Sequence, residues 1–115
     1  MKTVNNTLLI FLMILSGCDQ QMKFDKAKWA TKDDMEYPYR DLMLKDLTIN
    51  HKLTGLKYSL LIDLLDKPDF ADSASLSYEL LVHYEVIDPD YSKNLEFSFG
   101  KDSVVKSFRI VEWKK

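Results

Sequence analysis

An apolar residue at every second position from 76 to 86, with Leu81 as the one apolar residue among the intervening positions, limits most strongly how this chain can fold. Successive side chains of a β-strand point to opposite faces, so an apolar residue at every second position predicts a strand with one buried face. A sheet of this kind needs a second layer, which the rest of the chain must supply. We expect six side chains to face the core: Leu76, Tyr78, Leu80, Val82, Tyr84 and Val86.

Two further strands are expected after this one. The residues Asp88-Pro89-Asp90 are typical of a turn, and Leu95, Phe97 and Phe99 then alternate with polar residues. A third strand is predicted over residues 104–113, although its apolar positions do not keep one phase. A bulge near Lys106 would let both Val105 and Phe108 face the core.

Two helices are expected before the strands. The first begins near Pro38, which suits a first helical position, and is closed by Asn50-His51-Lys52. The second ends at Asp66, before Pro68, and its N-cap is either Thr54 or Lys57. Their apolar stripes comprise Tyr39, Leu42, Met43 and Leu47 in the first, and Leu60, Leu61, Leu64 and Leu65 in the second. The order α-α-β-β-β predicts an α+β fold, with two short helices packed on one face of a three-stranded antiparallel meander.

An apolar run at the start of the chain predicts a leader. Lys2 precedes eight uncharged apolar residues at positions 8–15, which fit a signal peptide and fall short of the ~20 residues that span a bilayer. The following Leu15-Ser16-Gly17-Cys18 resembles the lipobox of bacterial lipoproteins at all four positions. That resemblance implies that Cys18 is diacylated and becomes the first mature residue. The alternatives are an ordinary signal peptide, or a cytosolic chain with an apolar first helix.

These boundaries divide the chain into a signal peptide at 1–17, a lipid-anchored tether and lead-in at 18–32, and one α+β domain at 33–115. We expect Phe24 and Trp29 of the lead-in to tuck onto the domain. Cys18 is the only cysteine, so its acylation would leave no thiol for disulfides, catalysis or metal binding. The net charge of −2, without long runs of one sign, argues against a nucleic-acid surface and a polybasic membrane patch.

The helical region resembles the SmpA/OmlA-type small lipoproteins of the bacterial envelope. The resemblance is carried by Arg40, Met43 and Asp46-Leu47, then Leu53-x-Gly55, then Leu61, Leu64-Leu65 and Pro68. It implies a fold like one repeat of the β-lactamase-inhibitor protein. It also implies an envelope lipoprotein, of which the best-known kind is an accessory subunit of the machine that inserts outer-membrane proteins. This chain departs from the pattern at Asp66, where the family has glycine, and at Lys57, where it has a small polar cap.

No pattern of residues predicts a reaction centre or a bound cofactor. A nucleophile motif of the Gly-x-Ser-x-Gly type is missing, and the two glycines after the leader cannot form a phosphate-binding loop, which excludes a nucleotide site of that kind. His83 and Glu85, with Glu96 across the strands, are too few ligands for a structural zinc site, so we expect solvated polar side chains there. Candidate partner contacts are Tyr37, Tyr39, Arg40, Glu79, Leu81, His83 and Glu85.

The sequence therefore predicts a non-catalytic, lipid-anchored protein of the bacterial cell envelope that faces the periplasm and binds another protein. The alternative is a domain that binds a ligand or a metal ion on the exposed face of its sheet. Asp19 follows the lipidated cysteine, and in some bacteria an aspartate there retains a lipoprotein at the inner membrane. The choice between inner and outer membrane stays open.

Overall fold

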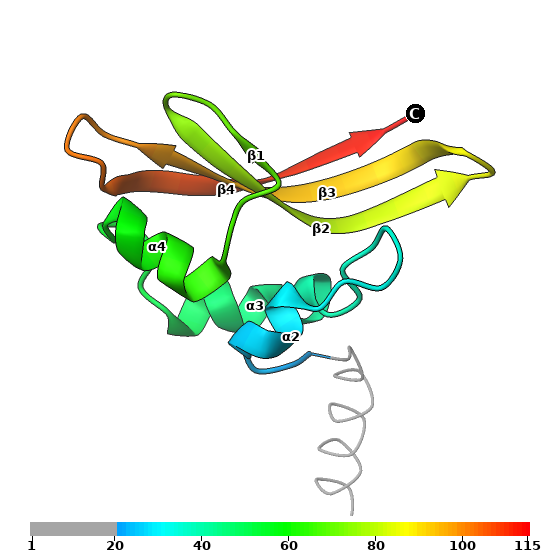
Figure 1. Ribbon diagram of the computed structural model, residues 1–115, viewed down its shortest axis with the longest axis horizontal. Coiled ribbons are helices and arrows are strands. Elements are labelled where there is room, and N and C mark those ends of the chain that lie inside the picture. The colour runs from blue at the N-terminus through cyan, green and yellow to red at the C-terminus, as the bar shows by residue number, and fades with distance from the viewer. Residues whose placement is uncertain (1–20) are drawn as a thin grey trace, which may run out of the picture.

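The computed structural model describes residues 21–115, in which three helices pack on one face of a four-stranded antiparallel sheet (Figure 1). Cys18 and the leader lie outside the described residues. The sheet has the order β1-β2-β3-β4, so each strand pairs with its neighbours along the chain. The elements are α2 (Lys26–Ala30), α3 (Arg40–Asn50), α4 (Tyr58–Leu65), β1 (Phe70–Ala71), β2 (Ser75–Glu85), β3 (Asp88–Phe99) and β4 (Val105–Lys114).

The expected α+β class is confirmed, but the three-stranded meander with two helices is wrong. The lead-in contains the short helix α2, whose N-cap Asp25 accepts a hydrogen bond from the backbone N–H of Lys28. The segment expected to be a loop contains β1, where Phe70 pairs with Ser77 of β2. The helix α2 has five residues and β1 has two, so neither is long enough to show a periodicity in the sequence. Contacts with distant parts of the chain determine whether such short elements form.

Both predicted helices form, close to their expected bounds. The N-cap of α4 is Lys57, the second of the two alternatives. Leu61 belongs to the core cluster and Leu56 packs against it, as in a hydrophobic staple. Leu60 was expected on the buried stripe, but 49% of its surface is exposed. The helix ends at Leu65, and its C-cap Asp66 has a φ of 66°, in a region that favours glycine.

A bulge in β2 shifts its pairing register with β3. Glu79 pairs with Asn94 of β3, whereas Leu81 pairs with Lys93, so β2 has one extra residue at Leu80. One extra residue exchanges the faces on which the following side chains lie. Leu76, Tyr78, Leu80 and Val82 are all buried as expected, although Val82 lies outside the main core cluster. Tyr84 is only half-buried, and Val86 is 93% exposed. Val86 was expected in the core, but it lies in the turn that follows the strand.

The bulge expected near Lys106 is confirmed. Ser98 of β3 pairs with Ser107, and Phe99 pairs with Val105, which leaves Lys106 as the extra residue of β4. Val105 is 1% exposed, and Phe108 packs against the core cluster.

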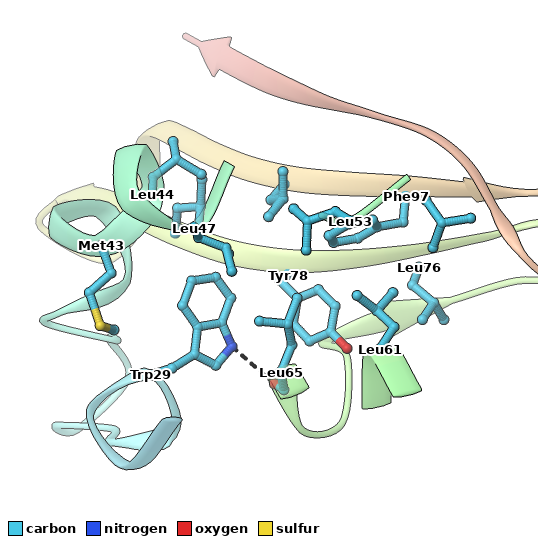
Figure 2. Packing of buried hydrophobic residues seen from close by; sticks show 13 residues of the cluster. Trp29, Met43, Leu44, Leu47, Leu53, Leu61, Leu65, Leu76, Tyr78 and Phe97 are labelled. Carbon is cyan, nitrogen blue, oxygen red and sulfur yellow. Dashed lines mark hydrogen bonds between the residues drawn. The ribbon is translucent and has the colours of Figure 1, made fainter. Parts of the chain in front are cut away.

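Trp29 lies between the helices and the sheet, with no exposed surface (Figure 2). Its indole N–H donates a hydrogen bond to the carbonyl of Leu65, at 2.9 Å, and the hydroxyl of Tyr78 donates to the carbonyl of Asp66, at 2.7 Å. Two aromatic side chains thus satisfy carbonyls at the end of α4, where a helix has no internal donors. The core cluster contains Trp29, Met43, Leu44, Leu47, Leu53, Leu61, Leu65, Leu76, Tyr78, Leu80, Leu95, Phe97 and Val105.

We expect Trp29→Ala to lower the free energy of unfolding by about 3–5 kcal/mol, because it opens a cavity and frees a buried carbonyl. Trp113→Ala is the matched control: this tryptophan is 48% exposed, and its loss should change stability by about 1 kcal/mol or less. Urea unfolding followed by circular dichroism measures both. Equal effects of the two substitutions would contradict this account of the core.

Candidate protein-interaction surface

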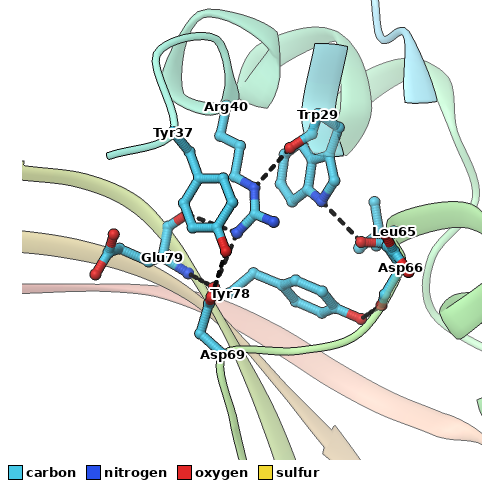
Figure 3. A network of polar contacts seen from close by, with 8 residues as sticks. All are labelled: Trp29, Tyr37, Arg40, Leu65, Asp66, Asp69, Tyr78 and Glu79. Carbon is cyan, nitrogen blue, oxygen red and sulfur yellow. Dashed lines mark hydrogen bonds and ion pairs between the residues drawn. The ribbon is translucent and has the colours of Figure 1, made fainter. Parts of the chain in front are cut away.

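Arg40, the first residue of α3, is at the centre of a network of hydrogen bonds between four segments of the chain (Figure 3). Its side chain donates to the carbonyl of Trp29 at 2.9 Å, to the carboxylate of Asp69 at 2.8 Å and to the carbonyl of Glu79 at 3.0 Å. The same carboxylate accepts from the hydroxyl of Tyr37 at 2.9 Å and from the backbone N–H of Glu79 at 2.7 Å. One ion pair therefore joins α2, the start of α3, the residue before β1 and the edge of β2.

Aromatic rings enclose the guanidinium group. Its carbon lies 3.4 Å from the ring centroid of Tyr37 and 4.8 Å from that of Trp29, and Arg40 is only 2% exposed. Such stacking suits arginine, whose planar cation is weakly hydrated. Arg40 was expected in an exposed partner contact. It instead lies within the fold, where the half-buried Asp69 supplies a counter-ion that no local pattern in the sequence reveals.

Tyr37 and Tyr39 differ in their surroundings. Burial and the neighbouring Asp69 carboxylate raise the pKa of Tyr37, so its hydroxyl stays a hydrogen-bond donor. Tyr39 is half-buried, packs against the core cluster and lies 6.0 Å beneath the ammonium group of Lys28. Each tyrosine thus contributes to packing and keeps some exposed surface.

The bulge at Leu80 separates the other four candidate contacts. Glu79 shares a face with its partner Asn94, whereas Leu81 shares the opposite face with Lys93, whose ammonium group bonds to Asp41 of α3. Burial, and secondarily Asp69, raise the pKa of the half-buried Glu79 carboxyl. Leu81, His83 and Glu85 line a groove together with Asp90, Tyr91, Lys114 and Lys115.

The side chain of His83 bonds to that of Asp90. In the strand register His83 pairs with Tyr91 and Tyr84 with Pro89, so Asp90 is the extra residue of β3 at a second register shift. The Nδ1 of His83 lies 2.6 Å from the Asp90 carboxylate, and this hydrogen bond raises the pKa of the imidazole. Glu96 does not approach His83 but bonds to Arg109 at 2.8 Å. Within residues 21–115, no three side chains of His, Cys, Asp or Glu gather closely enough to hold a metal ion.

The tip of the β2–β3 hairpin exposes apolar side chains that the sequence did not single out. Val86 and Ile87 form its turn and are 93% and 81% exposed. The expected turn at 88–90 is wrong, because Asp88 already pairs with Glu85 and begins β3. Val86 has a φ of 64°, an outlier for a β-branched residue, so the chain accepts backbone strain at this tip.

A cleft lies beside this tip and is partly lined by its apolar side chains. Met35, which is 59% exposed, lies in the turn between Asp33 and Glu36 and lines the cleft together with the hairpin tip. We call the exposed residues Met35, Val86 and Ile87 the apolar tip. The cleft is also lined by Asp34, Glu36, His83 and Tyr84, and the acidic residues Glu85 and Asp88 flank the turn. The surface is therefore apolar with an acidic border.

Comparison with known proteins gives no match to a protein-family model, a curated protein or a solved structure. No helix within residues 21–115 is long and apolar enough to cross a membrane.

We expect Arg40→Met to lower the free energy of unfolding by about 3 kcal/mol, because it leaves the Asp69 carboxylate and two backbone carbonyls without their cation. Arg109→Met is the matched control, since the Arg109 side chain is 72% exposed and its bond to Glu96 is worth about 0–1 kcal/mol. Chemical unfolding measures both variants. A loss at Arg40 no larger than that at Arg109 would contradict the role assigned to the buried pair.

Proposed function

We propose that this chain is a non-catalytic, lipid-anchored protein of the bacterial cell envelope whose domain binds another protein through the apolar tip. The observation that carries the proposal is the gathering of Met35, Val86 and Ile87 around one cleft, with exposed fractions of 59%, 93% and 81%. Contiguous exposed apolar side chains with a polar border are typical of protein-binding sites.

The charges around the cleft support a particular kind of partner. Asp34 and Glu36 line it, and Glu85 and Asp88 flank the hairpin turn, so an apolar side chain of the partner would be flanked by lysine or arginine. The same carboxylates disfavour insertion of the tip into an anionic lipid surface. A protein partner therefore suits this surface better than a membrane does.

The anchor and the family resemblance support the location. Leu15-Ser16-Gly17-Cys18 satisfies the lipobox, and two or three acyl chains hold a protein firmly to a membrane. The residues of α3 and α4 that resemble the SmpA/OmlA-type lipoproteins favour an accessory role in an envelope assembly.

We expect cells grown with a radioactive fatty acid to label the protein at Cys18, because the lipobox directs acylation to that sulfur. Cys18→Ala should abolish the label, and it removes the only cysteine of the chain. Gel autoradiography of the purified protein measures the incorporation. An unlabelled native protein, or a label that persists in Cys18→Ala, would refute the anchor.

We expect Ile87→Asp to reduce the yield of crosslinked partner at least about tenfold, because a charge in the apolar centre of an interface removes a contact worth over about 1.4 kcal/mol. Phe70→Asp is the matched control: Phe70 is 70% exposed, lies on β1 and does not line the cleft. Crosslinking in intact membranes, followed by affinity purification, gives the yields. A native protein recovered alone, or equal yields from both variants, would contradict the proposal.

A further inference from the structure

The beginning of the described chain is fastened to α3. The backbone N–H of Met22 donates to the carbonyl of Leu42 at 2.9 Å, and that of Phe24 donates to the carboxylate of Asp46 at 2.7 Å. Phe24 also stacks edge-on against His51, with ring centroids 5.4 Å apart. Met22 therefore has a fixed position on the domain.

Only three residues separate Met22 from Cys18, which makes four steps along the chain. A fully extended chain covers about 3.3–3.6 Å per residue, so Cys18 lies at most about 14 Å from Met22. If Cys18 is acylated, as proposed above, its sulfur lies at the boundary of the hydrocarbon, beneath a headgroup layer about 5–8 Å thick. The surface around Met22 must then lie within or directly above the headgroups.

The side chains around Met22 suit this position. A shallow groove is lined by Met22, Lys23 and Lys45, together with Ile49 and Asn50 of α3. Ile49 is 67% exposed, although it lies next to a helix face that buries Met43 and Leu47. The one acidic side chain of the groove, Asp46, already accepts hydrogen bonds from the Phe24 amide and from Asn50.

We propose that this groove contacts the phospholipid headgroups of the membrane that holds the anchor, with Ile49 inserted between them and Lys23 and Lys45 near their phosphates. An apolar side chain between lysines is the pattern of interfacial membrane contacts. Each lysine near an anionic surface strengthens such a contact about fivefold. The helices then lie between the bilayer and the sheet, whose opposite face points away from the membrane (Figure 1).

The test uses the acylated full-length protein in vesicles of phosphatidylcholine and phosphatidylserine. Acylation blocks the only native cysteine, so a fluorophore can be placed on Ile49→Cys, or on Asn50→Cys if the first variant does not fold. Val86→Cys is the matched control at the exposed hairpin turn. Quenching by a nitroxide on the lipid headgroup reports the distance from the membrane surface.

We expect the label at position 49 or 50 to be quenched several-fold more strongly than the label at position 86. Equal or weaker quenching at 49 and 50, in protein that floats with the vesicles, would overturn the membrane contact and leave the anchor intact. The same result would follow if the groove binds a protein instead. Protein that does not float with the vesicles would overturn both the anchor and the contact.

Discussion

The ion pair between Arg40 and Asp69 is the interaction on which the arrangement of this domain depends. The pair brings together the start of α3, the residue before β1, the helix α2 and one strand position of β2. No local pattern in the sequence predicts that these four segments lie close together. They meet because a buried guanidinium needs acceptors on every side, and here they are the carbonyls of Trp29 and Glu79 and the Asp69 carboxylate. Buried pairs of this kind add little net stability over apolar packing, but a wrong arrangement leaves their charges unsatisfied. We infer that the pair selects one packing of helices on the sheet.

This arrangement gives the domain two different exposed regions. The turn at 33–36 follows α2 and reaches the hairpin tip, whereas the groove at Met22 lies on the outer side of α3. The first region is apolar with an acidic border, and the second combines Ile49 with two lysines. Under the proposed function, the second region rests on the lipid surface and the first is held away from it for a partner. Orientation would then come from the short tether together with the rigid packing around Arg40.

The sequence predicted the elements whose periodicity is long enough to read. The apolar stripes of α3 and of α4 apart from Leu60, the three long strands and the bulge at Lys106 follow from local pattern, because each element has several apolar positions. The sequence does not predict the bulge in β2, because the apolar residues keep their spacing of two through it. The adjacent apolar residues Leu80 and Leu81 are the one local feature that marks its position. Val86 was assigned to the core because the alternation runs one residue past the strand. Asp69, α2 and β1 depend on partners distant in sequence, and no local pattern marks them.

A double-mutant cycle on Arg40→Met and Asp69→Asn tests the central claim most directly, because it isolates the energy of the pair from the packing of each side chain. Contacting residues in one polar network show coupling energies of about 0.5–3 kcal/mol, whereas independent sites add within about 0.5 kcal/mol. We expect a coupling of at least about 1.5 kcal/mol in equilibrium unfolding. Additive effects of the two substitutions would show that the pair does not hold the domain together.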